Sequence, residues 1–185
     1  MADTGEFRNG FTMTIEGTIF SIAEFQHVKP GKGGAFVRTK LRNVKTGAVI
    51  ERTFRSGDKV DEIRLEKREM QFLYADGDVF HFMDQQTFDQ LDVSSEVLGD
   101  VAGLMKENET VFLLMAEEKP LSAELPNFVE LAISHTEPGM KGDTATGAVK
   151  PATLETGAVV MVPLFVNLSD VLRIDTRTGE YVERV

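Results

Sequence analysis

Cysteine and tryptophan are both absent from this 185-residue chain, which also holds only two tyrosines and six prolines. Without cysteine there can be no disulfide framework, no thiolate zinc site and no cysteine nucleophile, and we expect a reducing, cytoplasmic location. No apolar run approaches the roughly 20 residues that span a bilayer, so we expect no membrane partner. The hydrophobic content of 42% with 27% charged residues is typical of a globular chain.

Basic residues are scarce and unevenly placed. The chain carries 20 Lys+Arg against 30 Asp+Glu, and its formal net charge of −10 argues, taken whole, against a nucleic-acid partner. By region the net charge is +3 over 1–64, −10 over 65–127 and −3 over 128–185. Nine basic residues but only two acidic ones lie between Lys29 and Lys59. This asymmetry is compatible with a polyanion-binding module on an acidic body and equally with a merely solvated sheet face, and the charge count alone leaves both open.

Period-2 alternation punctuated by turns predicts many short strands. Apolar and basic residues alternate over Ala35–Asn43, and Asp76-Gly77 is a strong hairpin signal. A single helix is expected, with Ser94 or Ser95 as its N-cap and apolar residues at helical spacing up to Lys106. This pattern predicts an all-β protein of small barrels with one short helix.

The tetrapeptide Thr-Gly-Ala-Val occurs three times, at Thr46–Val49, Thr146–Val149 and Thr156–Val159. Four residues are too few to define a repeat. We interpret each copy as a turn, in which glycine takes a positive φ and valine begins the next strand.

Two changes of composition divide the chain into three parts. The charge switches from basic to acidic near Arg64 and Leu65, and Pro126-Asn127 marks a second boundary. We therefore expect domains over residues 1–64, 65–127 and 128–185. Units of this size need tight barrel closure, because cores so small are only marginally stable.

The glycine-rich segment Lys29–Ala35 is the first candidate site. It lacks the Gly-Lys-[Ser/Thr] sequence of a P-loop and the third glycine of a dinucleotide fingerprint. Its composition instead predicts a slim hairpin tip that presents Lys32 alone, as a cation suited to phosphate or to covalent extension. The residues that frame this lysine are Pro30, Gly31, Gly33 and Gly34. A glycine-rich hairpin with a merely solubilising lysine is the alternative.

Catalytic and metal-binding patterns are not found in the sequence. There is no Gly-x-Ser-x-Gly, and no histidine has an obvious serine and acid partner. The acid pairs Asp76/Asp78 and Glu117/Glu118 stand at expected turns, and His81 is expected on the polar face of a strand. We therefore expect no catalytic residue, no metal and no cofactor. A small hydrolase that uses acidic loop residues is the remaining alternative.

Two features of the last third suit contact with RNA. The long loop Pro138–Gly147 is rich in glycine and small polar residues, which favours backbone-mediated contact with RNA or protein. Near the C-terminus, Tyr181 and Arg184 combine an aromatic ring with a guanidinium, a pair that can stack on a base or bind a ribose-phosphate. An ordinary flexible loop is the alternative for the first feature.

Five segments together resemble one protein family, the bacterial translation elongation factor P family. They occur in order along the chain and are Phe25–Asn43, Asn127–Leu131, Pro138–Gly147, Lys150–Gly157 and Asp175–Val182. The sequence departs from the family at 167–170, where a glycine-containing turn is more usual. The hypusine-containing relatives of eukaryotes and archaea fit less well, because they lack the third domain.

The resemblance implies an SH3-like (KOW-type) barrel followed by two OB-folds. It also implies a non-enzymatic factor that binds the ribosome between the peptidyl-tRNA and exit sites and relieves stalling at consecutive prolines. Both ribosomal subunits and peptidyl-tRNA would then be partners, the chain would act as a monomer, and a lysine-modifying enzyme is a further possible partner. A general single-strand RNA-binding OB-fold protein acting off the ribosome is the alternative, but it requires exposed stacking aromatics.

Residue by residue, the resemblance assigns three groups of contacts. Lys32 reaches towards the CCA end of the tRNA, in many family members after enzymatic extension. The third-domain loop faces the small subunit and the exit-site codon, and Tyr181 and Arg184 contact RNA there. The residues of that loop that match the family are Gly142, Asp143, Thr144 and Gly147. The basic residues that we expect to face tRNA or ribosomal RNA are Lys29, Arg38, Lys40 and Arg42.

Overall fold

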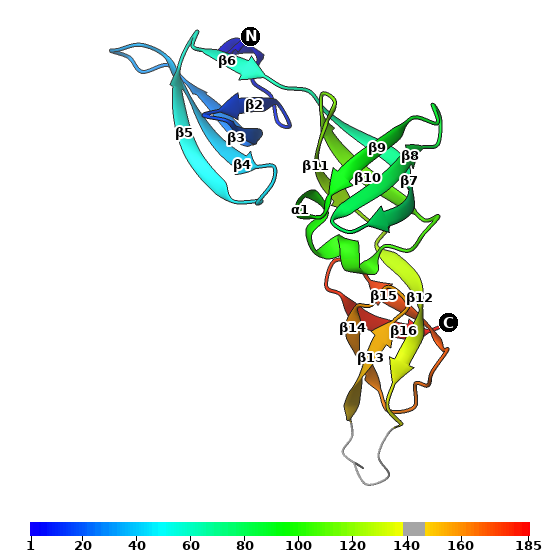
Figure 1. Cartoon of the computed structure of the whole chain (residues 1–185). Coiled ribbons are helices and arrows are strands. Elements are labelled where there is room, and N and C mark those ends of the chain that lie inside the picture. The colour runs from blue at the N-terminus through cyan, green and yellow to red at the C-terminus, as the bar shows by residue number, and fades with distance from the viewer. Residues whose placement is uncertain (139–146) are drawn as a thin grey trace. The chain divides into compact units, whose positions relative to one another are not determined.

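The computed structural model describes residues 1–138 and 147–185, and this part of the chain is mostly β-strand (Figure 1). The strands form one six-stranded sheet and two five-stranded sheets. The chain divides into two compact units, which are residues 1–66 with 115–121 and residues 67–114 with 122–185. None of the described helices is both long enough and apolar enough to cross a membrane.

The six-stranded sheet lies in the first unit and runs in the order β1-β6-β2-β3-β4-β5, with each neighbouring pair antiparallel. A short 3-10 helix, η1 (Thr4–Glu6), follows the first strand and is capped by the side chain of Asp3. The strands are β1 (Ala2–Asp3), β2 (Thr12–Ile15), β3 (Thr18–Val28), β4 (Phe36–Asn43), β5 (Val49–Arg55) and β6 (Lys59–Glu62). The best-buried core residues are Phe11, Met13, Ile22, Val37 and Leu41.

β4 shows how the sequence pattern positions charge in this unit. Val37, Thr39 and Leu41 are buried, whereas the basic residues between them are exposed. The Thr39 hydroxyl, buried among apolar side chains, donates a 2.8 Å hydrogen bond to the Arg52 carbonyl of β5. The expected alternation is therefore confirmed, and it sets all the basic side chains of β4 on the outer face of the sheet.

The second sheet runs in the order β11-β10-β7-β8-β9. β7 and β8 form the hairpin that Asp76-Gly77 predicted, and Gly77 has a φ of 60°. The strands are β7 (Leu65–Asp76), β8 (Val79–Asp84), β9 (Gln90–Ser94), β10 (Thr110–Ala116) and β11 (Lys119–Glu124). The core residues on these strands include Phe72, Phe82, Val93, Val111, Leu113 and Met115.

The helix expected between Ser95 and Lys106 is interrupted after one turn. α1 (Ser95–Leu98) begins after Ser94, as predicted, although the Ser94 side chain makes no capping hydrogen bond. Gly99 then takes φ 57° and ψ −138°, which is outside the helical region and ends α1. The chain continues as a 3-10 helix, η2 (Gly99–Leu104). Leu98 and Leu104 are buried, as the apolar spacing predicted, although the helix is not continuous between them.

The third sheet runs in the order β14-β13-β12-β15-β16, with each neighbouring pair antiparallel. It lies within the second unit. The strands are β12 (Phe128–Thr136), β13 (Val149–Leu154), β14 (Val159–Pro163), β15 (Val171–Asp175) and β16 (Glu180–Arg184). Its core includes Leu131, Leu154, Val162, Val166, Leu172 and Ile174.

The mostly β architecture of small sheets is confirmed by these three sheets, which use residues 2–62, 65–124 and 128–184. The domain boundaries at 64/65 and 127/128 stay a prediction. The turn assignment of the repeated tetrapeptide is confirmed, because Gly47, Gly147 and Gly157 have φ values of 74°, 94° and 90°.

Candidate nucleic-acid interface

The loop that carries Lys32 closes the hairpin between β3 and β4. Val28 pairs with Phe36, so residues 29–35 lie beyond the last pair of the ladder. Lys29 and Lys32 are both exposed, and neither side chain makes a hydrogen bond or ion pair within residues 1–138 and 147–185. Both ammonium groups are therefore available to an anionic partner.

Three glycines lie beside Lys32, and the structural reason for glycine differs from one position to another. Gly33 has a φ of 112°, in the region that disfavours any side chain, and a Cβ there would meet the Pro30 ring at 3.9 Å. Gly31 and Gly34 have no positive φ, and within the described residues a Cβ at either would meet no heavy atom within 4 Å beyond its chain neighbours. The fold therefore requires glycine at only one of the three positions. Glycine at the other two positions keeps the tip narrow, although the fold would accept a side chain there.

The basic face of β4 is partly neutralised by its neighbours. The Lys40 ammonium lies 2.8 Å from the Glu24 carboxylate, and this hydrogen bond and charge raise the pKa of Lys40. Arg38 lies over the Phe36 ring, with its guanidinium carbon 5.6 Å from the ring centroid. Arg42 is exposed and makes no ion pair with any described residue. Of the three predicted contacts on β4, Arg38 and Arg42 thus carry uncompensated charge, and Lys40 does not.

The predicted loop of the third sheet is only partly within the described residues. Gly142, Asp143 and Thr144 lie outside them, while Gly147 is exposed and begins the turn into β13. Lys150 was not among the residues predicted from the sequence; it is only 7% exposed and donates a 2.8 Å hydrogen bond from Nζ to the carbonyl of Glu137. A signal was present, because Lys150 occupies the same face of the strand as the buried Ala152 and Leu154.

The two predicted C-terminal contacts both lie on β16. Tyr181 is half-buried and pairs with Ile174 of β15. The Arg184 guanidinium lies 3.3 Å from the Asp170 carboxylate and covers the Phe165 ring at 5.7 Å. In the protein by itself, Arg184 therefore already has a carboxylate partner. A contact with RNA must either replace this ion pair or share the guanidinium with it.

The turn at 167–170, where the resemblance implies a glycine, holds Asp170 in place without one. Ser169 has a φ of 68°, a conformation more often taken by glycine. The Asn167 N–H donates to the Asp170 carboxylate at 2.8 Å, and this bond, followed by the Arg184 guanidinium, lowers the pKa of Asp170. The turn therefore keeps the ionised partner of Arg184 in position.

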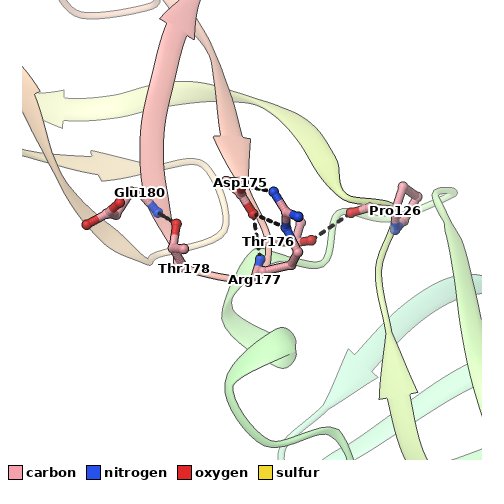
Figure 2. Close-up of polar contacts among 6 residues, drawn as sticks. All are labelled: Pro126, Asp175, Thr176, Arg177, Thr178 and Glu180. Atoms are coloured by element: carbon pink, nitrogen blue, oxygen red, sulfur yellow. Dashed lines mark hydrogen bonds and ion pairs between the residues drawn. The ribbon is translucent and has the colours of Figure 1, made fainter.

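The β15–β16 hairpin is fixed to the segment that precedes the third sheet (Figure 2). The Thr176 hydroxyl donates a 2.7 Å hydrogen bond to the carbonyl of Pro126. The Arg177 guanidinium contacts both carboxylate oxygens of Asp175, at 3.0 and 2.6 Å, and lowers the pKa of Asp175 to about 2. Arg177 is thus committed to structure, although sequence alone would count it among the basic residues.

A contact of His81 with an aromatic ring and a carboxylate was not expected from the sequence. His81 stands on β8 as predicted, and its Nδ1 lies 2.7 Å from the Asp92 carboxylate of β9. The Tyr74 ring stacks on the His81 ring with centroids 4.4 Å apart. The contact follows from strand register, because Tyr74 pairs with His81 across the β7–β8 hairpin and His81 pairs with Asp92 across β8 and β9. The sequence indicated the first hairpin but not the register that sets these side chains together. Among the described residues there is no group of three metal-ligating side chains.

Comparison with known proteins identifies the family. Models of the elongation factor P KOW-like domain, OB domain and C-terminal domain match residues 3–60, 65–123 and 129–184. Elongation factor P of Pelotomaculum thermopropionicum is 57% identical, and that of Acetivibrio thermocellus is 56% identical, with 100% of this chain and of each relative covered. A solved translation initiation factor eIF-5A family protein from Naegleria fowleri has a TM-score of 0.55 at 16% identity, covering 67% of this chain and 96% of that one, which shows the fold alone. The chain, with its KOW-like barrel followed by OB domains, belongs to the elongation factor P family.

Proposed function

We propose that this chain, a translation elongation factor by its family, binds the ribosome between the peptidyl-tRNA and exit sites. There it stimulates peptide-bond formation and relieves stalling at consecutive prolines. Its partners are both ribosomal subunits and peptidyl-tRNA, and it acts in the cytoplasm as a monomer. The ribosomal RNA performs the chemistry, so the chain itself is not an enzyme.

The observation that carries this proposal is the exposed hairpin tip around Lys32. Its ammonium has no partner among the described residues, and Gly31 and Gly34 keep the surrounding volume empty although the fold does not require glycine there. A narrow cationic tip is suited to enter a crowded RNA site and place one positive charge beside a phosphate.

The proposed contribution of the tip is orientation. Proline is a slow nucleophile, and correct positioning of two reactants can contribute up to roughly 7–11 kcal/mol in favourable intramolecular reactions. A protein that holds the peptidyl-tRNA in a reactive geometry needs only a fraction of that value to relieve a stall. This requires binding groups and no catalytic residue.

The other predicted residues would supply binding. Lys29, Arg38 and Arg42 are exposed and would contact the tRNA or ribosomal RNA backbone, whereas Lys40 would contribute less because Glu24 already neutralises it. Gly147, Tyr181 and Arg184 are proposed to face the small subunit at the exit-site codon. Gly142, Asp143 and Thr144 share that assignment as an expectation from sequence.

The test is a Lys32→Ala variant in a purified translation system that synthesises a Pro-Pro-Pro reporter. We expect rescue of the stalled reporter to be lost. Lys45→Ala is the matched control, because Lys45 is another exposed lysine in a hairpin turn of the same unit. Full rescue by Lys32→Ala, or equal loss in both variants, would contradict the role of the tip.

Covalent extension of Lys32 by a modifying enzyme is a further part of the proposal. The exposed ammonium on a slim tip is accessible to such an enzyme. Intact-mass spectrometry of the protein from its native cells, compared with Lys32→Arg from the same cells, measures it directly. A mass increment in the wild type that is absent from the variant is the expected result.

A further inference from the structure

A cavity of about 460 Å³ opens in the first unit, and Arg42 is the one of its lining residues that belongs to the proposed RNA contacts. All of its lining residues belong to that unit. They are Gly10, Thr12, Ser21, Arg42, Asn43, Val44, Gly47, Glu62, Ile63, Arg64 and Leu65. The volume is in the range that holds small ligands.

The cavity lies at the opposite end of β4 from the Lys32 loop. Phe36 begins β4 next to that loop, and Arg42 follows six residues later. At about 3.4 Å per residue, this separates the cavity from the start of the strand by roughly 20 Å. The barrel therefore presents cationic groups at both ends of one strand.

Two arginines that line the cavity have no anionic partner among the described residues. Arg42 and Arg64 are exposed, and in the described part of the chain neither side chain forms an ion pair or hydrogen bond. The one carboxylate of the lining, Glu62, lies 4.0 Å from the Arg8 guanidinium, which does not line the cavity. The lining therefore carries a net positive charge.

The remaining polar groups of the wall are mostly engaged. The Asn43 side-chain oxygen accepts hydrogen bonds from the N–H groups of Lys45 and Thr46, at 2.8 and 3.0 Å, and this orients its amide nitrogen away from the turn. The Thr12 hydroxyl donates to the Ile63 carbonyl. Apart from the Glu62 carboxylate and the Ser21 hydroxyl, the groups left for a ligand are therefore donors, chiefly the side chains of Arg42 and Arg64.

We propose that this cavity binds a phosphate group of an RNA backbone, with Arg42 and Arg64 as its ligands. A guanidinium offers paired N–H donors that match two phosphate oxygens, and both Arg42 and Arg64 belong to the cavity lining. Taking RNA as the source of the phosphate rests on the proposed function. A second anchor at the far end of β4 would fix the direction in which the barrel lies along its RNA.

The experiment compares the wild type with Arg42→Gln, Arg64→Gln and Arg52→Gln. The last is a charge-matched control, because Arg52 is an exposed arginine of the same unit that covers the Phe54 ring and does not line the cavity. Inorganic phosphate is titrated by NMR, with the backbone amides of Val44 and Ile63 as probes. Binding of deacylated tRNA is then measured at several salt concentrations.

We expect saturable phosphate shifts at the cavity amides in the wild type and Arg52→Gln, and their loss in the two cavity variants. Their tRNA affinity should fall about five- to tenfold at low salt, with a salt slope smaller by about one contact. Loss of phosphate binding with unchanged tRNA affinity would overturn RNA as the source and indicate a free phosphate ester. Equal behaviour of all three variants, or no phosphate binding by the wild type, would overturn the site.

These outcomes are separate from those of the Lys32 experiment. A failed phosphate titration leaves the Pro-Pro-Pro assay unaffected. A failed Pro-Pro-Pro assay leaves the phosphate titration interpretable, because that measurement involves no ribosome.

Discussion

Lys150 donates a hydrogen bond from its ammonium to the carbonyl of Glu137, across 2.8 Å and almost out of contact with water. Glu137 follows the end of β12, and Lys150 is the second residue of β13. The bond therefore joins the two strands at the place where the predicted small-subunit loop leaves the sheet. A lysine is rarely buried unless its charge is satisfied. The hydrogen bond to Glu137, and not apolar packing, therefore accounts for a lysine at this position.

The first prediction is that Lys150→Met loosens this end of the third sheet. Methionine keeps the aliphatic bulk but cannot donate, so the free energy of local opening should fall by about 1–3 kcal/mol. Amide hydrogen exchange of β12 and β13 measures this free energy of local opening. It is preferred to whole-chain unfolding, because a protein of two units does not unfold in a single transition. Lys119→Met, at an exposed lysine of β11, is the control. Unchanged exchange in Lys150→Met would show that the bond does not matter.

The second prediction separates conformation from slenderness at the Lys32 tip. Gly33→Ala should cost about 1 kcal/mol because of its positive φ, while Gly31→Ala should cost close to nothing. Thermal unfolding of the first unit, followed through its own amide signals, measures both values. If Gly31→Ala is the more destabilising variant, the assignment of the strained position is wrong.

The third prediction concerns the width of the tip. Gly34→Leu meets no neighbouring atom within 4 Å at its Cβ, so it should fold normally. It should nevertheless lose rescue of the Pro-Pro-Pro reporter, since a bulky side chain beside Lys32 would prevent close approach to RNA. The control is Gly57→Leu, a variant at a distant turn. Because Gly57 has a positive φ of 89°, this variant should lose some stability, but it should keep rescue of the reporter. A Gly34→Leu protein that rescues fully would rule out the need for a narrow tip.

The fourth prediction is the titration of Asp175. The Arg177 guanidinium lowers the pKa of this carboxylate to about 2, so the folded state favours its ionised form. The stabilisation is therefore complete above the ordinary value near 3.8 and is lost as the pH falls through about 2. NMR titration of the Asp175 side-chain carboxyl carbon measures this pKa directly. Arg177→Gln should raise it towards 3.8, and an unchanged pKa in that variant would contradict the assigned cause.

A feature of this structure could be predicted from the sequence when neighbouring residues in the sequence determine it. The outward Arg38 and Arg42, and the positive φ of Gly47, follow from neighbours in the sequence and were predicted correctly. α1 was predicted too long, because apolar spacing alone does not reveal the break that Gly99 makes.

The candidate site was predicted less completely for the same reason. Exposure of Lys32 could be inferred from its glycines, but neutralisation of Lys40 by Glu24 requires the register of β3 against β4. The cavity at Arg42 and Arg64 likewise brings together segments more than twenty residues apart. Charge can be counted in a sequence, whereas pairing of that charge is decided by the fold.

The fifth prediction is that Glu155 and Lys106 stabilise the second unit together. One carboxylate oxygen of Glu155 accepts from the Ala132 N–H at 2.9 Å and from the Lys106 ammonium at 3.0 Å. These bonds, the one from Ala132 first, lower the pKa of Glu155, so its contribution is present at neutral pH and lost as the pH falls below about 4.5. Glu155→Gln keeps an acceptor for Ala132 but removes the ion pair, and should cost about 1 kcal/mol in local stability by amide exchange.

Glu109 reports on the same change without any measurement of stability. Burial raises the pKa of Glu109, the charge of Lys106 lowers it, and the negative charge of Glu155 adds to the rise. In Glu155→Gln that negative charge is gone and the Lys106 ammonium is released, so both effects lower the pKa of Glu109. A side-chain NMR titration should therefore show the pKa of Glu109 moving down towards its ordinary value. In the control Glu130→Gln, where only a weaker charge is removed, the shift should be smaller. Equal shifts in the two variants would show that Lys106 is not held by Glu155 in solution.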